Sequence, residues 1–214
     1  MVTRLNIDGA FRVPRLVIRL CMSKNGIEKL EVTAEKGIVE DQVKLADLYF
    51  NGAGVKKDYK KAAYWAGKAA ERGQPAAQNK LGYLFFHGLG VEKDYFEAIK
   101  WYVRAARQNN DKAQANIGNI YANGIGLEKD LVEAYAWYNL ACASSEAWIQ
   151  SKKARPLKLR VGNPTKADFP FEARDSIESQ LVRPEIIKAH RRTRELKKSL
   201  SSAIPLNLPF KIDF

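Results

Sequence analysis

The sequence predicts an all-α protein whose helices form a right-handed superhelical solenoid of stacked two-helix repeats. Three observations support this fold class: a 36-residue period in the middle of the chain, an apolar stripe at helical spacing in each copy, and a Gly-x-Gly turn between the two helices of each copy. Because one helix pair cannot bury both of its apolar stripes, successive copies must stack and share a continuous core.

Residues 38–145 divide without a gap into three units of 36 residues. Each unit contains a turn of the form Gly-x-Gly-Val/Leu-x-Lys-Asp, followed by a segment of the form Ala-x-x-Trp-x-x-x-Ala. Seven positions are identical in all three units, which chance does not plausibly supply. We expect structural roles for the repeated glycines, aspartates and tryptophans, which are Gly52, Gly54, Asp58, Trp65, Gly88, Gly90, Asp94, Trp101, Gly124, Gly126, Asp130 and Trp137.

The helix boundaries in each unit follow from its turn residues. Leu45, Leu48 and Tyr49 form a stripe at i, i+3 and i+4 in the first helix, and equivalent residues recur in the other units. The glycines that follow allow the positive φ that ends a helix. The next aspartate is a natural N-cap of the second helix, and Glu97 and Glu133 complete a capping-box pattern in units two and three. We expect the tryptophans to pack in the core beside small alanines.

These motifs resemble the Sel1-like repeat family, a relative of the tetratricopeptide repeats, over residues 38–145. Half of a preceding unit is similar at residues 26–37, and residues 173–196 resemble the paired closing helices of many bacterial members. The resemblance implies that these helices cap the last repeat and that the protein is an adaptor or scaffold. The cysteine pairs of the secreted branch of the family are missing from the repeats.

We therefore divide the chain into three parts. Residues 1–37 form an N-terminal cap and partial repeat, and residues 38–145 form the three repeats. Residues 146–214 hold a basic insertion, the closing helices and a tail. The tail, residues 203–214, contains two prolines and is expected to be extended rather than helical.

The composition limits the class of protein. Lysine and arginine outnumber aspartate and glutamate by 36 to 24, a net charge of +12. Seven of these excess charges lie in residues 146–214, whereas the array of repeats contributes only +2. Cys21 and Cys142 are the only cysteines, which excludes a disulfide-dense scaffold. Since we find neither an apolar run long enough for a membrane span nor a signal peptide, we expect a soluble, cytoplasmic protein.

The sequence offers no catalytic constellation. His87 and His190 are the only histidines, and no metal-binding spacing of histidine or cysteine occurs. The Gly-x-Gly turns lack the third glycine of a dinucleotide site and the Gly-Lys-Ser/Thr of a P-loop. Some secreted relatives are described as β-lactamases, but no Ser-x-x-Lys is present. We therefore expect no enzyme activity, cofactor, metal or small-molecule substrate.

The polar face of the first helices differs between the units, which makes it the candidate partner-binding surface. Its residues follow i, i+3 and i+7 spacing and so share one side of each helix. If the first helices line the concave side of the solenoid, this first-helix ladder fits a peptide or helix from a partner protein. A merely solvated face is the alternative. The ladder consists of Lys44, Asp47, Asn51, Lys80, Tyr83, His87, Asn116, Asn119 and Asn123.

A basic C-terminal region, residues 152–198, carries the second candidate site. Three interpretations remain open: a solvated face of the cap, a contact for an acidic protein or lipid surface, and a nucleic-acid interface. Aromatic and amide side chains that would read bases are scarce between residues 183 and 198. The basic patch consists of Lys152, Lys153, Arg155, Arg191, Arg192, Arg194, Lys197 and Lys198.

Overall fold

A computed structural model describes residues 24–145 and 169–202, and every regular element in these two ranges is an α-helix. The ladder and the turns lie inside the first range, whereas Lys152, Lys153, Arg155 and the tail lie outside the described residues. The helices are α2 (Lys24–Glu35), α3 (Val39–Asn51), α4 (Tyr59–Glu71), α5 (Pro75–His87), α6 (Tyr95–Arg107), α7 (Asp111–Asn123), α8 (Leu131–Ser144), α10 (Phe169–Glu178) and α11 (Arg183–Ser201).

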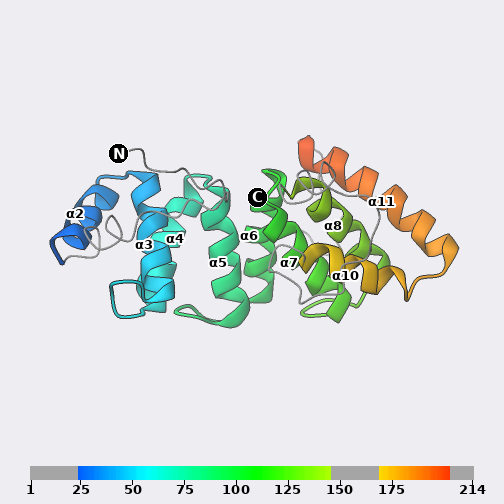
Figure 1. Cartoon of the computed structure of the whole chain (residues 1–214), viewed down its shortest axis with the longest axis horizontal. Helices are drawn as coiled ribbons and strands as arrows, with labels where there is room; N and C mark the ends of the chain where they lie inside the picture. The colour runs from blue at the N-terminus through cyan, green and yellow to red at the C-terminus, as the bar shows by residue number, and fades with distance from the viewer. Residues whose placement is uncertain (1–23, 146–168, 203–214) are drawn as a thin grey trace, which may run out of the picture.

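The helices pack in consecutive pairs along one axis (Figure 1). Helices α3 and α4, α5 and α6, and α7 and α8 form the three units, and the second helix of each unit packs on the first helix of the next. Helix α2 packs on α3 at one end, and α10 and α11 both pack on α8 at the other. The predicted solenoid of stacked two-helix repeats is thus confirmed. None of the described helices is long and apolar enough to cross a lipid bilayer.

The two glycines of each turn have different roles. The first ends a helix in the left-handed region, with φ of 71° at Gly52, and the Gly52 amide donates to the carbonyl of Leu48. The second also has positive φ, and it allows a close approach to the preceding unit. A Cβ at Gly90 would lie 2.2 Å from the backbone of Tyr59 at the start of α4. A Cβ at Gly126 would likewise lie 2.9 Å from the Tyr95 side chain at the start of α6. The turns of the second and third units therefore pack onto the previous second helix, which a larger residue would prevent.

The aspartates cap the second helices, but no reciprocal capping box forms at α6. The Asp94 carboxylate accepts from the amide of Glu97 at 3.0 Å, as an N-cap does. The Asp94 amide, however, donates to the carbonyl of Phe85 at 3.0 Å, and the Glu97 carboxylate pairs with Lys100 at 2.7 Å. The capping-box expectation was wrong here because the first helix of the unit already satisfies the N-cap amide. At the start of α8 the equivalent amide, that of Asp130, donates to the carbonyl of Tyr121.

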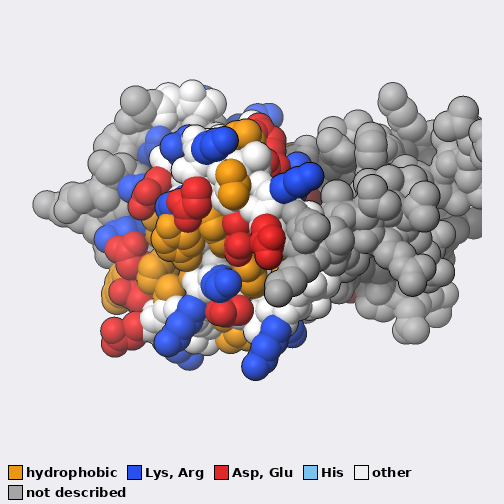
Figure 2. Space-filling view, turned by 90° about the vertical axis from the view of Figure 1, so that its left-hand side faces the viewer, with side chains coloured by type: hydrophobic (Ala, Val, Ile, Leu, Met, Phe, Trp, Pro, Cys, Tyr) orange, Lys and Arg blue, Asp and Glu red, His pale blue; other side chains and the backbone are white. Residues whose placement is uncertain are grey.

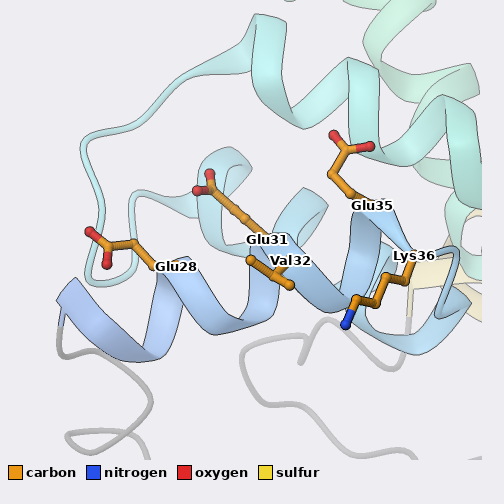
Figure 3. Close-up of a pocket in the computed structure, with 5 residues that line it drawn as sticks. All are labelled: Glu28, Glu31, Val32, Glu35 and Lys36. Carbon is orange, nitrogen blue, oxygen red and sulfur yellow. The ribbon is translucent and has the colours of Figure 1, made fainter.

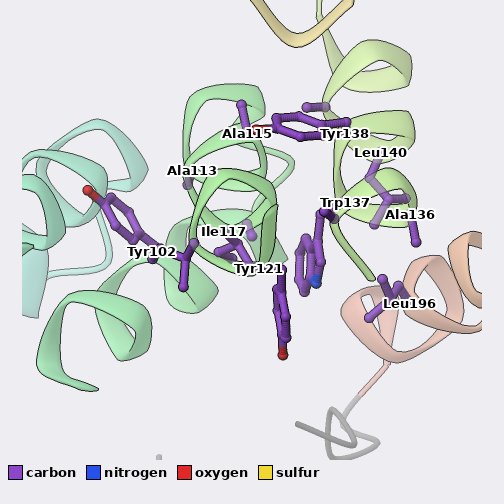
Figure 4. Close-up of a cluster of buried hydrophobic side chains, with 14 of the residues drawn as sticks. Tyr102, Ala113, Ala115, Ile117, Tyr121, Ala136, Trp137, Tyr138, Leu140 and Leu196 are labelled. Carbon is purple, nitrogen blue, oxygen red and sulfur yellow. The ribbon is translucent and has the colours of Figure 1, made fainter. Parts of the chain in front are cut away.

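The tryptophans occupy equivalent positions but differ in burial. Trp65 and Trp137 are 4% and 0% exposed, as expected for the core. Trp137 has Tyr121 of α7 on one side and Leu196 of α11 on the other (Figure 4). Trp101 is only partly buried, and the Arg104 guanidinium lies 4.5 Å from its ring centroid. The expectation of a core tryptophan therefore holds fully in two units of the three.

In the second and third units a glycine on the first helix faces a tyrosine on the second helix. A Cβ at Gly82 on α5 would lie 2.8 Å from the Tyr102 ring on α6, and one at Gly118 would lie 3.1 Å from Tyr138. In the first unit these two positions are both alanine. In the second and third units the glycine thus leaves room for the tyrosine ring, whereas the first unit has two small residues at these positions.

Helix α11 closes the last unit with an apolar face and one ion pair. Ala189, Leu196 and Leu200 are buried on α11. The Arg192 guanidinium on the same face donates to the carboxylate of Glu133 at the start of α8. Both charged side chains are less than one-fifth exposed. The cap therefore combines apolar burial with a partly buried, charge-assisted hydrogen bond.

Candidate partner-binding surface

The first and second units are joined across the ladder by an ion pair. The Lys80 ammonium on α5 lies 2.6 Å from the Asp47 carboxylate on α3. The same ammonium lies 4.5 Å from the ring centroid of Phe50, which gives a cation–π contact. Lys80 and Asp47, which the sequence placed on one face, are therefore brought together in space.

An aromatic group continues the ladder along α5. The Tyr83 ring lies 5.7 Å from Phe50 and 4.2 Å from His87, between ring centroids. Tyr83 is 37% exposed, so its ring is open to a partner. Partial burial, together with the charge of Lys93, lowers the pKa of His87. The imidazole is therefore neutral at neutral pH and adds an aromatic face rather than a charge.

The third unit contributes neutral amides. Asn116 on α7 donates to the side-chain oxygen of Asn79 on α5 at 3.0 Å, which joins the second and third units. Asn123 donates to the side-chain oxygen of Asn119 at 2.7 Å on its own helix. The ladder thus changes from charged to aromatic to amide side chains along the solenoid.

The two other ladder residues of α3 make local contacts only. Lys44 pairs with Asp41 one turn earlier, at 2.9 Å, and its side chain is 62% exposed. The Asn51 amide donates to the backbone carbonyl of Asp47 at 2.9 Å. Both lie at the exposed edge of the ladder, beside the Lys80–Asp47 ion pair.

Part of the basic patch also forms one surface. Arg191, Arg194, Lys197 and Lys198 line a shallow hollow of about 630 Å³ on α11, together with the acidic Glu195. Arg192 was expected in this group, but it belongs to the other face of the helix, where it is paired with Glu133. The exposed patch on α11 is therefore four cations rather than five.

A hollow beside α2, at the first end of the solenoid, was not predicted from the sequence. Figure 2 shows hydrophobic side chains at this end surrounded by acidic and basic ones. The hollow measures about 590 Å³ and contains Val32, which is 54% exposed. Figure 3 shows Glu31 and Glu35 pointing from α2 toward neighbouring helices. Glu35 pairs with Lys68 of α4 at 2.6 Å, so this rim is partly neutralised.

A repeated buried glutamine was also missed. Gln42, Gln78 and Gln114 are at most 5% exposed, and each amide donates to a carbonyl near the end of the preceding second helix. The acceptor carbonyls belong to alanines eight residues earlier in every case. The signal was present in the sequence, because these glutamines recur at the same 36-residue period. Their role is to join consecutive units, not to contact a partner.

The described residues contain no cluster of three or more histidine, cysteine or acidic side chains placed to hold a metal ion. Cys142 is buried and is not bonded to another cysteine. Burial raises the pKa of its thiol to about 11. A thiol in this state is a small core residue rather than a nucleophile.

The fold places the protein in the class of helical-repeat solenoids. A comparison with protein families identifies the family within this class. The Sel1 repeat family matches residues 39–74, 75–110 and 111–145, which together are half of the chain. The protein belongs to the Sel1 repeat family, as its motifs predicted. Members of this family are generally non-enzymatic scaffolds that mediate protein–protein interactions.

Two solved structures are similar along most of the chain. One is a protective antigen of uropathogenic Escherichia coli strains that displays an SLR fold, with 27% identity and a TM-score of 0.65 over 90% of this chain. The present chain spans 38% of that protein. The other is a Sel1 repeat protein from Oxalobacter formigenes, with 31% identity and a TM-score of 0.55 over 82% of this chain and 79% of that one. The curated proteins contain no significant match.

Proposed function

We propose that the protein is a non-enzymatic adaptor that binds a partner protein or peptide through its first-helix ladder. The observation that carries this proposal is the Lys80–Asp47 ion pair with the exposed Tyr83 ring beside it, at the junction of two units. The scaffold positions are the same in all three units, but the ladder positions differ. Variation at exposed positions of a shared repeat scaffold is what recognition of a specific partner requires.

The chemistry of the ladder favours an extended or helical segment with one large apolar residue. Tyr83 is a suitable aromatic anchor because a tyrosine offers a large contact area at a small cost in side-chain entropy. Lys80 is already fixed by Asp47 and Phe50, so less entropy is lost when a partner contacts it. The amides of the third unit suit hydrogen bonding to a partner's backbone.

The test compares partners captured from the native cell by the wild-type protein and by Lys80→Glu/Tyr83→Ala. A matched control is Lys68→Glu/Tyr64→Ala, which makes the same changes on α4, where Tyr64 is 51% exposed. We expect at least one partner to be lost, by about tenfold or more in affinity, with the ladder variant and to be retained with the control. Circular dichroism establishes that both variants fold. Retention of every partner by the ladder variant would show that the ladder is not the binding surface.

A second candidate function is binding of an anionic partner by the patch on α11. Its support is the hollow lined by Arg191, Arg194, Lys197 and Lys198. The steep salt dependence of DNA or RNA binding, and its loss in Arg191→Gln/Arg194→Gln, would favour nucleic acid. An absence of retention on either nucleic acid at low salt would leave an acidic protein or lipid surface for this patch.

A further inference from the structure

The turn of the first unit differs in charge from the turns of the other two. Residues 56–61 hold four lysines and one aspartate, a net charge of +3. Residues 92–97 and 128–133 each hold one lysine and three carboxylates, a net charge of −2. The three segments have the same backbone frame, with the same glycines before them and the same aspartate cap. The repeat fold itself therefore does not require the extra lysines.

The four lysines line one hollow. It measures about 730 Å³ and lies between the turn of the first unit and the start of α4. Val55, Tyr59 and Gly90 contribute its uncharged wall, and Gly90 comes from the next turn along the chain. The close contact of Gly90 with the Tyr59 backbone fixes this wall. Asp58 also lines the hollow but is outnumbered by the four lysines, so the hollow combines a net positive charge with apolar surface.

Three of the lysines have no acidic partner among the residues that the structure describes. Lys61 lies 3.2 Å from the Tyr49 hydroxyl and 3.9 Å from the carboxylate of Glu31. Within the described ranges no carboxylate lies in ion-pair distance of Lys56, Lys57 or Lys60, all of which are exposed. The Asp58 carboxylate accepts from the Lys61 amide as the N-cap of α4.

This arrangement is unfavourable for the helix. Lys60 and Lys61 lie in the first turn of α4, which has no acidic residue, whereas α6 and α8 have Glu97 and Glu133 there. Cations near a helix N-terminus oppose the helix dipole, and neighbouring lysines repel one another. Lysines that lower stability in one repeat, where the other two repeats have acidic residues, indicate a functional requirement.

We propose that the hollow lined by Lys56, Lys57, Lys60 and Lys61 binds an acidic segment of a partner protein. The segment would carry several carboxylates beside one aromatic or aliphatic residue, which contacts Val55 and Tyr59. No residue of the first-helix ladder lines this hollow, so the site is separate from the one in the proposed function.

The surroundings of the hollow favour a short peptide over a longer polyanion. The next turn carries a net charge of −2, and α2 presents Glu28, Glu31 and Glu35 on the other side. An extended nucleic acid or a flat anionic membrane would be repelled by these acidic groups, one of which, Glu31, lies 3.9 Å from Lys61 of the hollow. A short acidic segment confined to the hollow meets fewer of these acidic groups than an extended polyanion would.

The test uses a fluorescein-labelled peptide Glu-Glu-Phe-Glu-Glu, with Lys-Lys-Phe-Lys-Lys as the control probe, and measures fluorescence anisotropy on the full chain. We expect the acidic peptide to bind at low salt and Lys56→Glu/Lys60→Val to weaken this binding about tenfold. This variant introduces residues found at the same positions of the third unit. The matched control, Lys29→Val/Lys112→Glu, changes the net charge equally at two exposed lysines that line neither this hollow nor those on α2 and α11, and it is expected to bind the acidic peptide as the wild type does.

A transfer experiment tests the site in the opposite direction. Glu92→Lys/Phe96→Lys places two of the lysines on the turn of the second unit, and we expect it to bind the acidic peptide more tightly than the wild type. Lack of acidic-peptide binding by the wild type at low salt would overturn the proposal. An equal loss of acidic-peptide binding in Lys56→Glu/Lys60→Val and in its matched control would overturn it as well. The same holds if the Lys56 and Lys60 changes abolish retention on DNA or on phosphatidylserine vesicles, or abolish a dimer of this chain, while peptide binding is unaffected.

Discussion

Lys80 on α5 lies 2.6 Å from Asp47 on α3 and so joins two repeats that otherwise meet mainly through the second helix of one and the first helix of the next. The Lys80 side chain is 20% exposed, and that of Asp47 is 52% exposed. The pair is therefore partly shielded by Phe50 and remains accessible to a partner at its Asp47 side. It lies on the surface to which we assign partner binding.

We predict a small coupling energy for this pair. In a double-mutant cycle of Lys80→Ala and Asp47→Ala, the coupling in the free energy of unfolding should be about 0.2–1 kcal/mol, because both groups retain contact with solvent. High salt should reduce it. Urea denaturation at low and high salt measures this coupling. A value of several kcal/mol would mean that the pair is a main element of stability rather than part of a recognition surface.

Gly82→Ala should destabilise the protein by about 1–3 kcal/mol, because the new methyl group would meet the Tyr102 ring at 2.8 Å. Gly67→Ala is the matched control, since Gly67 lies in α4 and a Cβ added there would have no neighbouring atom within 4 Å. There we expect stabilisation of about 0.5–1 kcal/mol from the lower entropy of the unfolded chain and the better helix propensity. Thermal unfolding of the two variants separates these effects. A change in stability of the same sign in both variants would contradict the packing described for the second unit.

Arg192→Gln should lower the free energy of unfolding by about 1–3 kcal/mol, because it leaves the partly buried Glu133 carboxylate without its charged partner. Arg194→Gln on the exposed face of α11 should change it by no more than about 0.5 kcal/mol. Denaturant unfolding distinguishes the two variants. Equal effects would show that α11 is not held on α8 by this ion pair.

The shifted pKa of Glu133 leads to a prediction of how the stability of the protein depends on pH. Burial raises the pKa of its carboxyl above the ordinary 4.5, and this outweighs the opposite effect of Arg192. The folded state therefore binds this proton more tightly than the unfolded state, so the contribution of Glu133 to stability falls as pH rises from 4.5 through the folded-state pKa. The stability of the wild type minus that of Glu133→Gln should accordingly decrease from pH 4.5 to pH 7. A difference that increases over this range would show that Arg192 dominates instead.

The fold was predictable because its determinants are local and repeated. The apolar stripe of Leu45, Leu48 and Tyr49, the positive-φ glycines and the aspartate caps each act within a few residues, and the period repeats every signal three times. Gln42 and its equivalents also recur every 36 residues, so the period alone was enough to identify them.

Contacts between distant segments were not predictable in the same way. We expected Arg192 in the exposed basic patch, and only the fold shows that it lies on the face of the buried Ala189 and Leu196, opposite Glu133. The capping box failed because the Asp94 amide is used by Phe85, nine residues earlier. The charge difference of residues 56–61 is visible in the sequence, whereas the hollow exists only because Gly90 of the next turn packs beside it.

The most direct test of the proposed function is site-specific photo-crosslinking. A benzophenone amino acid replaces either Tyr83 on the ladder or Tyr64 on α4, and crosslinked partners are compared in the native cell. We predict that the residue at position 83 captures a partner that is lost in the Lys80→Glu background, and that the residue at position 64 does not capture it. Capture of the same partner at both positions, or capture at position 83 that is unaffected by Lys80→Glu, would contradict binding through the first-helix ladder.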